Sequence, residues 1–374
     1  MLKVGLLKEL KHYEGRVMLT PEAVKLLVKN GIEVFVENGA GESCKFDDIQ
    51  YERAGAVTLP TMEKVLGKAE LILQVQPPMP IEYELISENH IVISFMNLVQ
   101  KTERVQALLD TRGTYITVEL LQDQQGSYPV LMGMSEIAGK MAIYEAARLL
   151  TIATGGKGKL LSGTSMTKPS VVTVLGAGMV GRTVVEHALN NQLKVNLLSL
   201  KPQKNEGLKR QFPKADVRNY SIETLREVLP HTDVLVIAVY SLKQSYDIFI
   251  DRDTVNLMEK GSVLIDISVE QANIVETSHI TNHEQSSYVL DGIVHYCVPN
   301  IASIVPQTAS RTITKNSISF IKTLAREGLS NALVKEPGIL PALTMYKGKI
   351  TNRKFADLHG FEFYNIFELM ELNL

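Results

Sequence analysis

Residues 171–182 of the chain read Val171-Val-Thr-Val-Leu-Gly176-Ala-Gly178-Met179-Val180-Gly181-Arg182. This apolar, β-branched run leads into glycines spaced G-x-G-x-x-G, and a helical pattern follows over residues 183–190. In such a turn the first glycine permits a tight bend, the second lets a ligand approach the backbone, and the third allows close packing of helix on strand. Strand, glycine turn and helix in this order predict a nucleotide-binding unit.

The free N–H groups at the start of that helix are suited to hold phosphates. We therefore predict that Gly176, Gly178, Met179, Val180 and Gly181 bind the pyrophosphate of a nicotinamide dinucleotide. The alternative is a glycine-rich turn that holds no ligand. The series of strands predicted after this turn favours the first interpretation.

The second strand of such a fold usually ends in an acidic residue that binds the adenosine ribose. Here the corresponding residue is Ser199, and Lys201 and Lys204 follow closely. A carboxylate would repel a 2′-phosphate, whereas a small hydroxyl with nearby cations accommodates one. The sequence therefore favours NADPH as the cofactor, and NADH is the alternative if both lysines are only solvated.

Short apolar runs separated by helical stretches predict a doubly wound sheet in this part of the chain. The runs are 171–175, 195–200, 234–238, 263–268 and 288–291. Four earlier runs are typical of buried strands: 4–7, 34–37, 71–75 and 91–95. Between the first two, Thr20 as N-cap, Pro21 in the first turn and Gly31 beyond the end predict a helix.

Two longer helices are predicted elsewhere. One covers residues 134–150, with Ser135 as its cap, and connects to the part that contains the glycine turn. The other covers about 309–328. The glycine-rich segment 155–159 after the first of these helices is expected to be a flexible loop.

The composition limits the class of protein. The chain has 374 residues, of which 45% are hydrophobic and 21% charged, which suits two globular domains. Its formal net charge of −2 argues against partners such as nucleic acid or an anionic membrane. Two cysteines exclude a disulfide framework and a cysteine metal cluster, and favour a reducing, cytoplasmic location. No apolar run is long enough for a transmembrane helix.

Taken in order, several further segments resemble the alanine dehydrogenase family, which includes a transhydrogenase subunit. They are Lys8-Glu9 with Glu14-Gly-Arg16-Val-Met-Leu-Thr20-Pro21, Glu37-Asn-Gly-Ala-Gly41-Glu, Met134-Ser135-Glu136-Ile-Ala-Gly139, Val263-Leu-Ile-Asp266-Ile, and Tyr296-Cys297-Val298 with Asn300. The resemblance implies an α/β fold of two Rossmann-like domains with doubly wound parallel sheets, joined by long helices. It implies a substrate domain of 1–133 plus 302–374, a dinucleotide-binding domain of 134–301, and a homo-oligomer.

The resemblance also implies roles for individual residues. Arg16 matches the arginine that binds the substrate carboxylate, and a guanidinium does offer a carboxylate two parallel hydrogen bonds. The positions that match those lining the family's dinucleotide site are Ser135, Gly176, Gly178, Ser199, Val239 and Asn300.

The chain departs from the family where chemistry is expected. Gln76 stands for the family's substrate-binding lysine, Asn97 for its catalytic histidine and Glu270 for an aspartate, while Val118 replaces a tyrosine. Asparagine cannot titrate, and glutamine offers only neutral hydrogen bonds. Gln76 and Asn97 are therefore predicted to orient the substrate beside Arg16, and Glu270, Glu136 and His295 are the alternative proton donors.

Three functions follow from these residues. The first is an NADPH-dependent reductase of an imine or amino-acid-like substrate that carries a carboxylate. The second is an active alanine or amino-acid dehydrogenase. The third is a nucleotide-binding sensor or transhydrogenase-like protein without turnover of its own.

Overall fold

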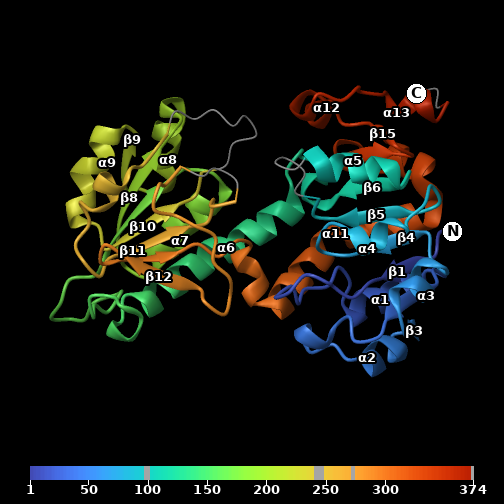
Figure 1. Cartoon of the computed structure of the whole chain (residues 1–374), viewed down its shortest axis with the longest axis horizontal. Helices are drawn as coiled ribbons and strands as arrows, with labels where there is room; N and C mark the ends of the chain where they lie inside the picture. The colour runs from blue at the N-terminus through green and yellow to red at the C-terminus, as the bar shows by residue number, and fades with distance from the viewer. Residues whose placement is uncertain (97–101, 240–247, 271–273, 372–374) are drawn as a thin grey trace. The chain divides into compact units, whose positions relative to one another are not determined.

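The computed structural model describes residues 1–96, 102–239, 248–270 and 274–371. Within these residues the chain divides into two compact units. The first consists of Met1–Met134 and Ser303–Leu374, and the second of Ser135–Ala302. Figure 1 shows that each unit is a central sheet with helices packed against it.

The first unit is built on an eight-stranded sheet of order β15-β14-β6-β5-β4-β1-β2-β3. Its strands are β1 (Val4–Leu6), β2 (Val34–Glu37), β3 (Val57–Leu59), β4 (Leu71–Leu73), β5 (Ile91–Ser94), β6 (Thr114–Thr117), β14 (Leu343–Tyr346) and β15 (Lys349–Ile350). The strands from β1 to β6 pair in parallel, and β14 and β15 pair antiparallel at one edge. The predicted α/β class with parallel sheets is confirmed, and in this unit two antiparallel strands are added at one edge. A tight turn through Lys347 and Gly348, both with positive φ, can join only antiparallel strands.

Helices flank this sheet. They are α1 (Pro21–Lys29), α2 (Asp48–Arg53), α3 (Met62–Leu66), α4 (Pro80–Tyr83), α5 (Thr102–Asp110), α11 (Pro306–Lys335), α12 (Arg353–His359) and α13 (Ile366–Leu369), with short 3₁₀ turns η1 (Glu42–Cys44), η3 (Val118–Leu120) and η8 (Pro337–Ala342). As predicted, α1 begins after Thr20 with proline in its first turn, and its buried face is Ala23, Val24 and Leu27. The helix predicted from 309 extends further, to Lys335, with a break at Gly328.

The second unit is built on a seven-stranded sheet of order β12-β13-β11-β10-β7-β8-β9. Its strands are β7 (Val171–Leu175), β8 (Lys194–Ser199), β9 (Asp216–Asn219), β10 (Val234–Ile237), β11 (Val263–Asp266), β12 (Ser287–Leu290) and β13 (Ile293–Tyr296). All pair in parallel except the edge strand β12, which a two-residue turn joins to β13. From β11 to β9 the strand order is that of a doubly wound dinucleotide-binding sheet, which reverses direction between β7 and β10.

Helices cover both faces of the second sheet. They are α7 (Met179–Asn190), α8 (Asn205–Gln211), α9 (Ile222–Val228) and α10 (Arg252–Val255), with 3₁₀ turns η4 (Ile152–Thr154), η5 (Pro202–Lys204) and η6 (Leu229–His231). Ala146 and Val184 belong to a core cluster with Val172, whereas Leu225 and Val255 belong to a separate cluster. Each fully buried side chain of this size contributes about 1.5–3 kcal/mol.

The connecting helix α6 spans Pro129–Leu149, and the 3₁₀ turn η7 spans Ile301–Ile304. Ser135 therefore lies inside α6, and the prediction that it caps this helix was wrong. Pro129 occupies the first helical position, where proline is well suited because the missing N–H has no partner there in any case. Among the described helices, none is both long enough and apolar enough to cross a bilayer.

Candidate functional site

The glycine turn lies at the carboxyl end of the central strand β7. Gly176 has a φ of +106°, and a Cβ placed there would lie 2.4 Å from the carbonyl oxygen of Ala238 at the end of β10. A Cβ on Gly181 would lie 1.9 Å from the carbonyl oxygen of Gly176. Both positions therefore require glycine, one for the turn and one for packing helix on strand.

Gly178 differs from its two neighbours in the motif. It is the N-cap of α7, and a Cβ placed there would meet no atom of the described residues within 4 Å. Nothing in the fold of the second unit demands glycine at this position. The open space lies in front of the first N–H groups of α7, next to the strand-order reversal where dinucleotides bind in such sheets. Gly178, Met179 and Val180 therefore form a turn that fits a pyrophosphate.

Three other residues predicted to hold the cofactor lie at the ends of strands. Ser199 ends β8 and is 1% exposed, and its hydroxyl is within 3.3 Å of both the N–H and the carbonyl oxygen of Lys201. The side chain of Lys201 is exposed. Val239 follows β10, and its N–H donates to the hydroxyl of Ser268 at 2.8 Å.

Two further residues predicted for this site belong to other segments. Ser135 is buried in α6. Asn300 has a left-handed backbone with a φ of +57°.

In the first unit, Arg16 is the centre of a buried polar cluster. Arg16 is 2% exposed, and its Nε and Nη2 donate to the two carboxylate oxygens of Glu14 at 2.7 and 2.5 Å. Gln76 adds a third donor, since its Nε2 lies 2.5 Å from Glu14 Oε2. The remaining nitrogen, Nη1, contacts the sulfur of Met134 at 3.5 Å, and the ring of Phe95 lies 5.7 Å from the guanidinium carbon.

This arrangement leaves one edge of Arg16 for a ligand. The Nε–Nη2 edge is occupied by Glu14, whereas Nη1 faces a thioether, which is a weak acceptor. A carboxylate at Nη1 would replace that weak contact with a charge-assisted hydrogen bond. Arg16 can therefore bind a substrate carboxylate without breaking its pair with Glu14.

Two glutamates in this cluster differ in their tendency to ionise. Burial opposes ionisation of Glu14, but the charge and hydrogen bonds of Arg16 outweigh it, so that the pKa of Glu14 lies below its ordinary value. Burial, aided by the charge of Glu14, raises the pKa of Glu9 to about 8. The Glu9 carboxyl accepts hydrogen bonds from the N–H groups of Val75 and Gln76.

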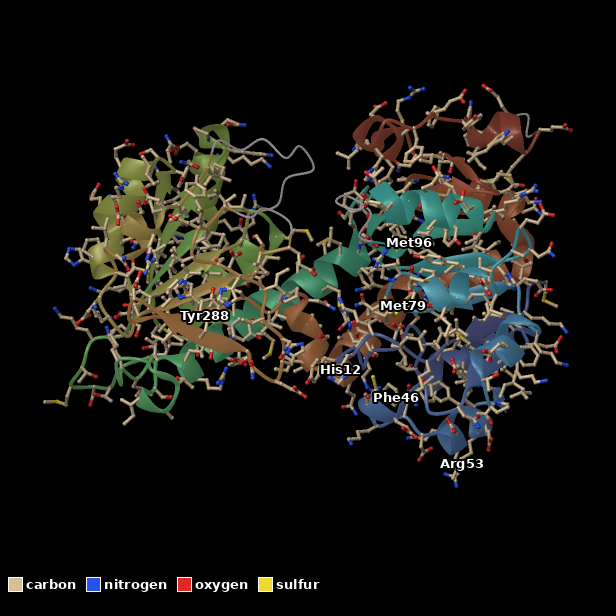
Figure 2. All side chains as sticks on the ribbon, in the orientation of Figure 1. His12, Phe46, Arg53, Met79, Met96 and Tyr288 are labelled. Carbon is tan, nitrogen blue, oxygen red and sulfur yellow. The ribbon has the colours of Figure 1, made fainter. Side chains whose placement is uncertain are left out.

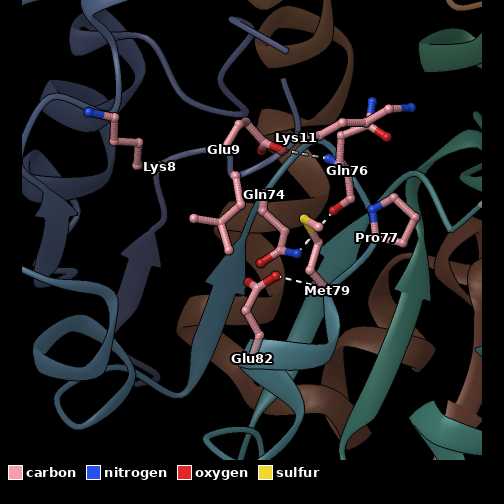
Figure 3. A pocket seen from close by; sticks show the side chains of 9 residues that line it. Lys8, Glu9, Lys11, Gln74, Gln76, Pro77, Met79 and Glu82 are labelled. Carbon is pink, nitrogen blue, oxygen red and sulfur yellow. Dashed lines mark hydrogen bonds between the residues drawn. The ribbon is translucent and has the colours of Figure 1, made fainter. Parts of the chain in front are cut away.

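No role was predicted for Glu9 or Glu14 from the sequence, although both belong to the segment that resembles the family. Their spacing around Arg16 was the feature of the sequence that could have identified them, because a buried arginine in a loop needs a carboxylate partner. Glu9 also lines a small pocket with Gln74, Gln76 and Glu82 (Figure 3).

The other two predicted catalytic residues are Asn97 and Glu270. Asn97 is outside the described residues. Glu270 is half-buried just after β11, where the described chain stops. Glu136, an alternative proton donor, is exposed on α6 and pairs with Lys140 at 2.5 Å.

The prediction that His295 is an alternative proton donor was wrong. It is completely buried in β13, where Nε2 bonds the hydroxyl of Thr277 at 2.8 Å and Nδ1 lies 3.0 Å from the carbonyl oxygen of Ile293. Burial lowers the pKa of His295 below its ordinary value. Tyr288, labelled in Figure 2, stacks on its ring at a centroid distance of 4.9 Å. His295 therefore serves the packing of the second unit.

Comparison with known families accounts for nearly the whole chain. The description "Alanine dehydrogenase/PNT, N-terminal domain" matches residues 5–138, and "Alanine dehydrogenase/PNT, C-terminal domain" matches residues 142–353. The chain belongs to the alanine dehydrogenase/PNT family. The family resemblance predicted from the sequence is thereby confirmed, as is an oxidoreductase of the alanine dehydrogenase type.

Individual members of the alanine dehydrogenase/PNT family agree with this assignment. Alanine dehydrogenase of Halomonas elongata is 33% identical over 363 residues, which cover 97% of this chain and 98% of the relative. A solved L-alanine dehydrogenase superposes with a TM-score of 0.88 at 29% identity, covering 96% of this chain and 99% of that one. A transhydrogenase structure from Sinorhizobium meliloti, at 23% identity and a TM-score of 0.78, shares the fold and covers 94% of this chain and 99% of that one.

Proposed function

We propose that the protein is an NADPH-dependent reductase of an imine or iminium that carries a carboxylate. The observation that carries the proposal is the charge of the cluster around Arg16. Glu14 neutralises the guanidinium, and Gln76 contributes a neutral amide where the family resemblance implies a lysine. A neutral cluster accepts a cationic iminium better than one that contains a lysine, because like charges repel.

The missing titratable groups point to the same reaction. Oxidative deamination needs a group that takes protons from the amine and from attacking water, and histidine does this well near neutral pH. Asn97 and Gln76, aligned with the family's histidine and lysine, cannot do so. A preformed iminium removes that step, and what remains is orientation of the substrate for hydride transfer.

The second unit is proposed to hold the cofactor. Its pyrophosphate would lie against Gly176, Gly178 and the first turn of α7, and the nicotinamide supplies the hydride when bound. Ser199 ends β8 without a carboxylate, and the exposed Lys201 and Lys204 follow, which favours a 2′-phosphate.

The test is a nicotinamide absorbance assay with a panel of cyclic imines that carry a carboxylate, with Arg16→Ala as comparison. The proposal expects NADPH oxidation by the unaltered protein and a fall in kcat/KM of roughly 10- to 100-fold for Arg16→Ala, in line with the loss of a charged hydrogen bond. Absence of turnover with every imine, or equal kcat/KM for the two proteins, would overturn it.

Alanine dehydrogenase activity is the second candidate. It is favoured by relatives of that name at 33% identity over almost the full length. Robust oxidation of alanine with NAD, near 10 s⁻¹ as in ordinary dehydrogenases, would establish it in place of the first.

The location and assembly of the protein complete the proposal. Cys44 and Cys297 are both buried free thiols, which suits a reducing, cytoplasmic compartment. A homo-oligomer is proposed from the family resemblance, and sedimentation of the purified protein tests it.

A further inference from the structure

The pocket lined by Glu9, Gln74, Gln76 and Glu82 contains a buried acceptor without a donor. Gln74 is 4% exposed, and its Nε2 donates to the carbonyl oxygen of Gln76 at 3.0 Å. Its Oε1 is buried and has no hydrogen-bond partner among the described residues. Figure 3 shows the Gln74 amide pointing toward the carboxyl group of Glu82. A buried acceptor in this state is costly unless a ligand or water supplies a donor.

Two buried carboxyl groups line the same pocket. Glu82 is 4% exposed and accepts from the N–H of Met79 at 2.6 Å. Glu9 accepts from the N–H groups of Val75 and Gln76. Each of the two groups, once ionised, can accept about four hydrogen bonds, so both have acceptor capacity for a cation that ionises them. The acceptor atoms of Glu9, Gln74 and Glu82 are therefore suited to a ligand that donates hydrogen bonds.

The size and charge of the pocket define what it can bind. The pocket has room for one water-sized group, about 10 Å³, far below the 300–1,000 Å³ usual for a whole ligand, so it takes only the tip of a molecule. An ammonium group brings three donors and a positive charge, which match the acceptors and compensate the buried acids. Lys8 and Lys11 also line the pocket, and Figure 3 shows the Lys8 side chain directed away from Gln74 and Glu82.

We propose that this pocket binds a primary ammonium group at the far end of the carboxylated substrate. The assignment to the substrate rests on the proposed function, in which Arg16 holds the carboxylate. Gln76 links the two places, because it lines the pocket and its amide bonds Glu14, the partner of Arg16. The substrate class is therefore a carboxylated imine with a second, terminal amine.

Calorimetry with L-lysine and L-norleucine isolates this contact, because the two molecules differ only in the terminal amino group. The unaltered protein with bound NADPH is expected to bind lysine at least tenfold more tightly, or about 1.4 kcal/mol. Gln74→Leu and Glu82→Gln should each reduce this preference to below about threefold.

Glu70→Gln is the matched control. Glu70 accepts one backbone N–H, from Lys3 at 2.7 Å, as Glu82 does from Met79, but it does not line the pocket. Its variant should retain the preference for lysine. Equal affinity for both amino acids in the unaltered protein, absence of binding of either, or a preference that survives both pocket variants would overturn the proposal.

Proton release gives a second readout. Burial raises the pKa of Glu82 to about 7 and that of Glu9 to about 8, and a bound ammonium would lower both. Glu14 and Arg16 act on Glu9, and Glu37 acts on Glu82. The charged residues Lys8 and Lys11 also line the pocket. Lysine binding at pH 7.5, measured in buffers of different ionisation enthalpy, should release protons, and norleucine binding should not.

The two proposals fail separately. If simple carboxylated imines are reduced but a terminal amine gives no advantage, only the ammonium pocket is wrong. If lysine is preferred and the preference is lost in the variants, but no imine is reduced, the pocket is correct and the reductase is wrong.

Discussion

Gln76 is the residue on which the proposed chemistry depends most. Its amide donates to Glu14 beside the guanidinium of Arg16, and both glutamate oxygens are thereby occupied. The position of Gln76 next to Arg16 could be predicted from the family resemblance alone. Its contact with Glu14 could not, because the contact joins residues 62 positions apart through the end of β4.

Replacing Gln76 by lysine tests the neutral cluster. An ammonium next to Arg16 would add a charge that repels an iminium, so kcat/KM for cyclic imines should fall by at least tenfold. The measurement is steady-state reduction with saturating NADPH. Gln125→Lys, which adds the same charge on an exposed turn, should leave kcat/KM unchanged. An imine reductase that Gln76→Lys makes faster would contradict the role given to this amide.

Ser199→Asp tests the cofactor preference. A carboxylate at the end of β8 would repel the 2′-phosphate of NADPH and hydrogen-bond the free ribose hydroxyl of NADH. The ratio of the two dissociation constants should shift toward NADH by tenfold or more. An unaltered protein that binds NADH tenfold more tightly than NADPH would refute the preference.

The raised pKa of Glu82 predicts that the unfolding free energy depends on pH. Its pKa is raised to about 7 by burial, so the folded state holds its proton more tightly than the unfolded state does. The stability gained from that proton is complete below about pH 4.5 and is lost as pH rises through 7. Glu82→Gln should therefore flatten the fall in unfolding free energy between pH 5 and pH 8, measured by urea denaturation. An unchanged slope would show that Glu82 ionises normally.

At the scale of elements, the glycine turn was the best predicted feature. The bounds predicted for β7 are those observed, because its residues are mostly β-branched and mostly buried. Two other strands of the same sheet were missed. β9, with the sequence Asp-Val-Arg-Asn, is mostly polar, and β13 follows β12 after a two-residue turn and contains His295. Short strands of this kind form because neighbouring strands pair with them, and their own residues signal little.

The Gly178→Ala variant tests cofactor binding at the glycine turn without disturbing the fold. Because a Cβ there would meet nothing within 4 Å in the part of the chain that the structure describes, the variant should keep its Tm within about 2 °C. Its affinity for NADPH should fall at least tenfold, since the methyl group would occupy the space for the pyrophosphate. Gly207→Ala in α8 is the control, with equally open surroundings and no expected effect on binding. Unaltered affinity in Gly178→Ala would show that the pyrophosphate does not bind at this turn.

At the scale of the whole molecule, the chain uses two sheets for two tasks. The first unit contains the buried polar cluster around Arg16, and the second contains the glycine turn. The return of the chain to the first unit after residue 302 has little signal in the sequence itself. β14 and β15 are short, and their place at the edge of the first sheet depends on pairing with β6, more than 200 residues earlier.

Binding of the cofactor should stabilise the folded molecule. At a concentration one hundred times its dissociation constant, a ligand that binds only the folded state adds about 2.7 kcal/mol. NADPH should raise the Tm of the unaltered protein, and the rise should be much smaller for Gly178→Ala. Equal rises in the two proteins would place the cofactor elsewhere.

The central claim is that the protein delivers hydride to a carbon–nitrogen double bond that is already formed. The most direct measurement compares two reactions of the same protein preparation: NADPH-dependent reduction of cyclic imines that carry a carboxylate, and NAD-dependent oxidation of alanine. The account predicts turnover in the first, dependent on Arg16, and a rate in the second lower by 10²- to 10⁴-fold, the usual contribution of acid–base catalysis. Alanine oxidation near 10 s⁻¹ without reduction of any imine would contradict it.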